Sequence, residues 1–139
     1  MNARFALAAC TALAVLFAGT SVLTHHSFTM FEMEKDVTYK GVVVDYMWVN
    51  PHVHITVDIK PGPGVDPATV GTWDVEGAST NIMGRQGWTR ATLKPGMEIS
   101  FVAHPMRDGS KGVSLFYLIG PDGKRLYQDI ARPKGEGVK

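Results

Sequence analysis

The five histidines are the residues of this chain whose type and spacing best fit a chemical role. They are His25, His26, His52, His54 and His104. Imidazole is the commonest metal ligand in proteins, and its neutral form suits zinc and copper. His52 and His54 alternate with Val53 and Ile55. Both imidazoles are therefore expected on one face of a strand, about 7 Å apart along it, where they can converge on one ion.

His104 follows the same alternation in a second segment. Ile99, Phe101 and Ala103 precede it at every other position, which predicts a solvent-facing imidazole opposite that apolar side. We therefore expect a copper or zinc site, copper preferred, with His52, His54 and His104 as strand-borne ligands and His25 or His26 completing it. In the alternative interpretation, each histidine lies at the surface or bonds a neighbouring carbonyl.

A second polar group predicts a ligand site that needs no metal. It consists of Glu76, Arg85, Trp88 and Arg107, with Asp74 and Asp108 nearby. These residues fall at expected strand ends and turns, so they could line one mouth of a barrel and bind a protein or a small ligand. The same residues could instead form an arginine–carboxylate brace, with Trp88 as a core plug.

Several chemistries are excluded or disfavoured by composition. The only cysteine is Cys10, so a domain that lacks the first residues has no thiolate ligand and no disulfide. The chain has 14 basic and 13 acidic residues, a balance that argues against nucleic-acid binding. No nucleophile elbow, phosphate loop or dinucleotide fingerprint is present. We expect a binding module rather than an enzyme, and a metal-dependent hydrolase with Glu76 as general base is the remaining alternative.

The first 24 residues have the layout of a secretory signal peptide. Arg4 is followed by an apolar run over 5–18 and then by the small residues Gly19, Thr20 and Ser21. An uncleaved membrane anchor and a lipoprotein site at Cys10 are the alternatives. Cleavage would leave a periplasmic or secreted domain over 25–130, with no stable membrane insertion and with a periplasmic protein as a conceivable partner. We expect residues 131–139, a polar tail, to be flexible.

The order of expected elements favours a small β-barrel. Strands are predicted over 37–49, 52–60, 70–76, 97–104, 113–119 and 126–127, and a short helix follows Ser79 or Thr80. Three strands, a helix and two further strands are the order of an OB-like barrel. The fold class is therefore mainly β, an OB-like barrel of five to six strands with one short helix between strands 3 and 4. A different barrel or a sandwich is the alternative.

Several short segments, taken in order, resemble one known family. They are His25-His26-Ser27-Phe28, Gly41-Val42-Val43, Asn50-Pro51-His52, Trp73-Asp74-Val75-Glu76-Gly77, Gly84-Arg85-Gln86-Gly87-Trp88, Leu93-Lys94-Pro95-Gly96 and His104-Pro105-Met106-Arg107-Asp108-Gly109. The set, which extends from His25 to about Leu126, resembles the domain of unknown function 6152 family. Thr80 departs from the proline expected after the serine. The resemblance implies a small exported bacterial domain and carries no established activity.

Overall fold

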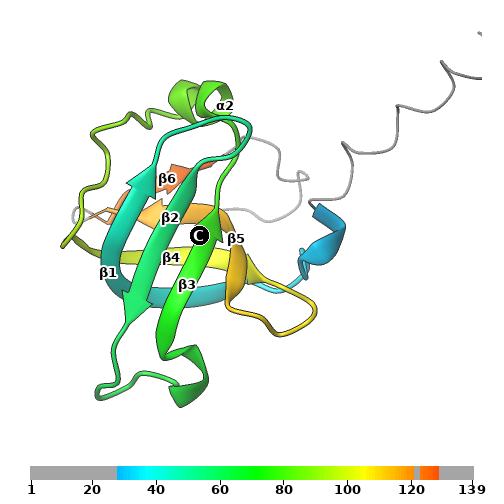
Figure 1. Ribbon diagram of the computed structural model, residues 1–139, viewed down its shortest axis with the longest axis vertical. Helices are drawn as coiled ribbons and strands as arrows, with labels where there is room; N and C mark the ends of the chain where they lie inside the picture. Colours follow the sequence, from blue (N-terminus) through cyan, green and yellow to red (C-terminus); the bar gives the residue numbers. More distant parts are fainter. Residues whose placement is uncertain (1–27, 121–122, 129–139) are drawn as a thin grey trace, which may run out of the picture.

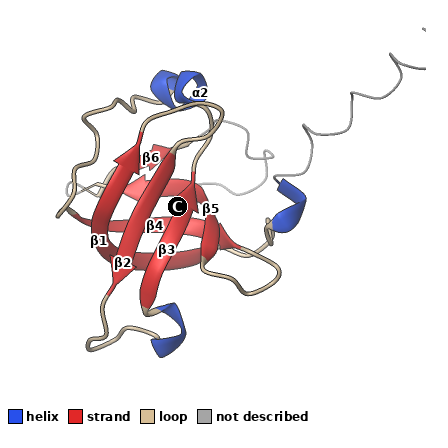
Figure 2. Cartoon of the chain, viewed as in Figure 1, coloured by secondary structure: helices blue, strands red, loops and turns tan. Residues whose placement is uncertain are grey.

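The computed structural model describes residues 28–120 and 123–128, as a barrel with short helical segments at its margins (Figures 1 and 2). The elements are η1 (Phe28–Met30), β1 (Val37–Met47), β2 (His54–Ile59), η2 (Pro67–Thr69), β3 (Gly71–Glu76), α2 (Thr80–Arg85), β4 (Glu98–Pro105), β5 (Gly112–Ile119) and β6 (Arg125–Tyr127). The expected signal peptide, His25, His26 and the expected tail lie outside the described residues. In the described part, no helix is long and apolar enough to cross a membrane.

Five strands close into a barrel, and β6 extends it at one edge. The strand order is β3-β2-β1-β4-β5-β6, and a parallel pairing between β3 and β5 closes the ring. Figure 1 shows β1, β2 and β3 crossing in front of β4 and β5, with α2 over one end. The predicted mainly β, OB-like barrel with a short helix between the third and fourth strands is confirmed.

The long strand β1 belongs to both halves of the barrel because it bends in the middle. Its first half pairs with β4 and its second half with β2, and Val42 has partners on both sides. A register shift between Val43 and Asp45 adds a bulge. Gly41 permits the bend, since a Cβ there would lie 2.6 Å from Val57 Cγ1 and 2.8 Å from the Asp58 carbonyl oxygen.

The core follows from the alternation that predicted the strands. In β2 the inward side chains Ile55, Val57 and Ile59 are buried, whereas the intervening positions are half-buried. Met83 of α2 and Trp88 just beyond it close one end of the core, and both are buried. The Trp88 indole N–H donates to the Tyr127 carbonyl at 2.8 Å. Trp88 is therefore a packed plug with a satisfied donor.

The start of α2 is fixed by Ser79 and by the loop between β1 and β2. The Ser79 hydroxyl accepts the Ile82 backbone N–H at 3.4 Å, as an N-cap does. Thr80 donates to the Asn50 side-chain oxygen twice, from its backbone N–H at 3.1 Å and from its hydroxyl at 2.8 Å. These bonds join the β1–β2 loop to the helix immediately before His52.

Candidate imidazole–carboxylate site

The outer face of β2 and β3 is polar on both strands. His54, Thr56 and Asp58 point outward from β2, opposite its buried positions. In the antiparallel register His54 lies opposite Glu76 and Thr56 opposite Asp74. The ladder continues past the strand ends, because Val53 and the segment at Gly77–Ala78 exchange backbone hydrogen bonds of 2.7 and 3.1 Å. His52 is therefore held beside β3, although it precedes β2.

Two histidines each pair diagonally with a carboxylate of β3. His52 Nδ1 lies 2.6 Å from Glu76 Oε1 and 3.2 Å from the Gly77 carbonyl oxygen. His54 Nδ1 lies 3.1 and 3.3 Å from the two carboxylate oxygens of Asp74. All of these partners are acceptors, so in each ring Nδ1 carries the proton and donates it. In the neutral ring, Nε2 then bears the lone pair.

The two Nε2 atoms have no hydrogen-bond partner among residues 28–120 and 123–128. A histidine that binds a metal commonly donates its other ring N–H to a carboxylate or a carbonyl, which fixes the tautomer and the ring orientation. Both histidines have this arrangement, although no ligand is needed to produce it. The described residues contain no group of three or more His, Cys, Asp or Glu side chains that could hold a metal ion.

The expectation that His104 faces solvent beside His52 and His54 is wrong. His104 is only 5% exposed, its Nδ1 lies 3.1 Å from the Lys35 carbonyl oxygen and 3.3 Å from Asp36 Oδ1, and its ring stacks on Phe116. It does lie on the outer side of β4, but the segment before β1 folds against that side. Along the ladder β3 and β5 separate it from β2, a path of three strand spacings or about 14 Å. The three histidines do not gather.

The second predicted group is only partly assembled. Arg85 ends α2 and is exposed, whereas Trp88 is 2% exposed and cannot offer its ring to a ligand on the outer face. Arg107 is hydrogen-bonded to the η1 segment, because its Nε donates to the Thr29 carbonyl at 3.1 Å. No arginine forms an ion pair with Asp or Glu in the described residues, so the expected brace is not present there. Glu76 instead belongs with His52.

Asp74, like Glu76, belongs with a histidine and not with the arginines. It was grouped with the arginines, whereas the structure pairs it with His54. The signal was present: Thr72, Asp74 and Glu76 alternate with Trp73 and Val75 just as the histidines alternate with valine and isoleucine. Antiparallel pairing of the two segments places the carboxylates opposite the imidazoles.

Fold and site together define a small OB-like barrel domain with an imidazole–carboxylate face. The chain belongs to the DUF6152 family, described as a family of unknown function, whose model matches residues 12–114. The resemblance inferred from the sequence is thereby confirmed. No curated protein matches the chain. The family description assigns no activity, so only the geometry of the chain itself bears on its function.

Proposed function

We propose that this protein is an exported, non-enzymatic binding module that holds one copper or zinc ion at His52 and His54. The observation that carries the proposal is the pair of Nδ1–carboxylate contacts, His52 with Glu76 and His54 with Asp74. These contacts orient both imidazoles and leave both Nε2 lone pairs for a ligand. A carboxylate partner also raises the basicity of a ligating imidazole.

Two imidazoles from alternate positions of one extended segment, His52 just before β2 and His54 at its start, suit a shared ion. Their backbones are about 7 Å apart, and metal–nitrogen bonds of about 2.0–2.1 Å require the two rings to lean toward each other. Water oxygens would complete the shell, since the side chains of His54 and Asp74 are 30% and 60% exposed. Mixed nitrogen and oxygen ligands in a tetragonal arrangement favour Cu²⁺ over Zn²⁺.

Calorimetric titration of chelator-treated protein with Cu²⁺ and with Zn²⁺ tests the proposal. We expect one Cu²⁺ per chain, bound more tightly than about 1 µM, or about 8 kcal/mol. The His52→Ala/His54→Ala double variant should lose this binding. His104→Asn is the matched control, because it removes a histidine outside the site while an amide can still donate to the Lys35 carbonyl. A stoichiometric site that survives in the double variant would contradict the assignment, as would absence of binding in the wild type.

Binding should also stabilise the barrel by mass action. A ligand that binds only the folded state contributes about 2.7 kcal/mol when its free concentration is 100 times the dissociation constant. Thermal unfolding of the wild type should therefore shift upward with Cu²⁺, and that of the double variant should not. An unchanged melting temperature at saturating Cu²⁺ would count against a folded-state site.

The export part of the proposal is supported by the layout of residues 1–24, with Arg4, the apolar run and the small residues that follow. Expression in a bacterium, fractionation and intact-mass measurement test it. A periplasmic product that begins near His25 is the expected result. A full-length mass in the membrane fraction would favour an uncleaved anchor and overturn this part alone.

A further inference from the structure

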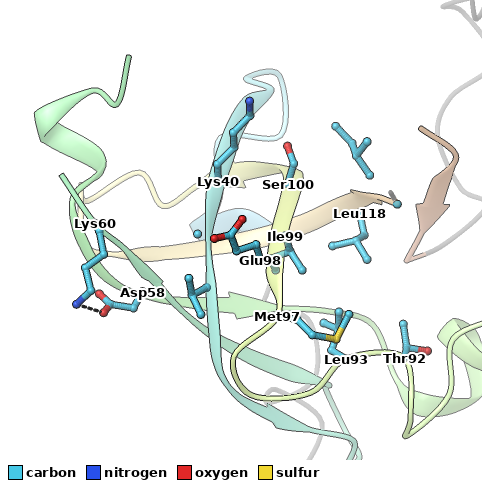
Figure 3. Close-up of a pocket in the computed structure, with 14 residues that line it drawn as sticks. Lys40, Asp58, Lys60, Thr92, Leu93, Met97, Glu98, Ile99, Ser100 and Leu118 are labelled. Atoms are coloured by element: carbon cyan, nitrogen blue, oxygen red, sulfur yellow. Dashed lines mark ion pairs between the residues drawn. The ribbon is translucent and has the colours of Figure 1, made fainter. Parts of the chain in front are cut away.

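A hollow of about 690 Å³ opens on the side of the barrel where β1, β2, β4 and β5 meet the loop that precedes β4. Its apolar lining includes Leu93, Met97, Ile99 and Leu118, which Figure 3 shows around one side of the space. Hollows of about 300–1,000 Å³ with an apolar lining and a few polar groups are typical small-molecule sites. No residue of the imidazole–carboxylate site lines this one.

Four charged side chains surround the apolar lining, and only two of them neutralise each other. Asp58 and Lys60 form an ion pair, drawn as a dashed line in Figure 3. Lys40 and Glu98 take part in no ion pair within the described residues. Figure 3 shows the Lys40 ammonium directed away from the Glu98 carboxylate. The rim of the hollow therefore offers one unpaired positive and one unpaired negative group.

The strand register sets the spacing of these two charges. Lys40 lies opposite Ser100, and Glu98 lies opposite Val42. Lys40 and Glu98 are thus diagonal neighbours on the same face of an antiparallel pair, with backbones about 7–8 Å apart. Ile119 lies opposite Ser100 and so shares this face, and Met97 is exposed nearby. Two side chains of this length can contact opposite charges of one small head group while the apolar part of the same molecule lies on Ile119 and Met97.

We propose that the hollow binds a small zwitterionic amphiphile. Its hydrocarbon chain packs on the apolar lining, its anionic group lies by Lys40, and its ammonium lies by Glu98. The net charge of the lining decides between head groups: two lysines balance Asp58 and Glu98, so a purely anionic or cationic head meets one partner and one like charge. A neutral head leaves both rim charges unpaired.

Titration of ¹⁵N-labelled protein with decylphosphocholine below its micelle concentration tests the site. We expect saturable shifts concentrated at lining amides such as Ile99 and Leu118. Decyl sulfate, decyltrimethylammonium and decyl maltoside carry the same chain on anionic, cationic and neutral heads, and each should bind at least about tenfold more weakly, or about 1.4 kcal/mol. Equal affinity for all four would overturn the zwitterion assignment, and absence of saturable shifts would overturn the site.

Charge-reversal variants separate the head-group contacts from general surface binding. Lys40→Glu should make decyltrimethylammonium the preferred ligand, and Glu98→Lys should make decyl sulfate preferred. Lys94→Glu is the matched control, because Lys94 is an exposed lysine of the adjacent loop that does not line the hollow. If the control changes the preference as much as Lys40→Glu does, the specific contact with Lys40 is refuted.

A filling variant tests the hollow itself. Ser100 lines it from β4 and is half-buried, so Ser100→Phe should occupy the space and weaken decylphosphocholine binding at least about tenfold. The amide spectrum reports whether this variant remains folded, and Ser100→Ala, which leaves the space open, should bind as the wild type does. Undiminished binding by a folded Ser100→Phe protein would contradict the proposal.

Discussion

Gly41→Ala is expected to destabilise the barrel although it adds a single methyl group. The added Cβ would lie 2.6 Å from Val57 Cγ1, 2.8 Å from the Asp58 carbonyl oxygen and 3.1 Å from Ile59 Cγ1. Carbon atoms normally approach to about 3.5–4.0 Å, so β1 and β2 would have to separate by several tenths of an ångström or more. Overpacking of this kind costs about 1–3 kcal/mol.

The same substitution at Gly84 is the internal control, with the opposite sign expected. Gly84 lies within α2, and a Cβ there would meet nothing within 4 Å. Alanine inside a helix is favoured over glycine by about 0.5–1 kcal/mol. Gly84→Ala should therefore stabilise the protein while Gly41→Ala destabilises it, and the difference between the two variants excludes a general effect of the glycine-to-alanine change.

Urea unfolding followed by circular dichroism measures both free energies of unfolding. For a domain of this size, each kcal/mol also corresponds to about 4–8 °C in the melting temperature. The free energy of unfolding should be lower than that of the wild type in Gly41→Ala and higher in Gly84→Ala. A neutral or stabilised Gly41→Ala protein would refute the close crossing of β1 and β2, since no flexible side chain could absorb the clash with the Asp58 carbonyl.

Three further predictions concern other parts of the structure. Trp88→Phe should lower the free energy of unfolding by about 1–3 kcal/mol, because the Tyr127 carbonyl loses its donor, and Trp88→Ala by about 3–5 kcal/mol, both measured in urea. His104→Ala removes the donor to the Lys35 carbonyl; it should cost about 1–3 kcal/mol and speed tryptic cleavage after Lys35. Burial raises the pKa of Tyr46 above its ordinary 10.0. The unfolded state therefore ionises first, and the free energy of unfolding should fall as pH rises past 10. In urea titrations at pH 8–11, the free energy of unfolding of the Tyr46→Phe variant should fall less steeply than that of the wild type.

Each of these has an outcome that contradicts it. Equal losses for Trp88→Phe and Trp88→Ala would mean that the indole ring is not packed in the core. Unchanged proteolysis of His104→Ala would show that this imidazole does not hold the segment before β1. An identical pH dependence in Tyr46→Phe would show that the phenol is not desolvated in the folded state.

Local patterns in the sequence are sufficient to predict the strands and their order along the chain. The alternation from Val53 to Ile59 marks β2 and its buried side, and the glycine- and proline-rich segments mark the turns. Ser79 was recognised as a candidate helix cap from its type and position. These features depend on residues that are close together in the chain, so they can be read without knowledge of the packing.

The parts of the site that depend on tertiary packing could not be predicted. Alternation placed His104 correctly on the outer side of β4, but not the covering segment that buries it. The pairing of Glu76 with His52 depends on the register of β2 against β3, which side-chain types alone do not set. The hollow beside Lys40 and Glu98 is formed by four strands and a loop, so no single sequence motif predicts it.

If His52 and His54 hold an ion as proposed, the parallel contact between β3 and β5 would link ion binding to the integrity of the barrel. This seam contains only three residue pairs, Asp74 with Gly112, Val75 with Val113 and Glu76 with Ser114. Asp74 and Glu76 are also the carboxylates that orient the two imidazoles. An ion that locks those imidazoles would hold β3 in place, and by thermodynamic reciprocity any strain that opens the seam would weaken the hold on the ion.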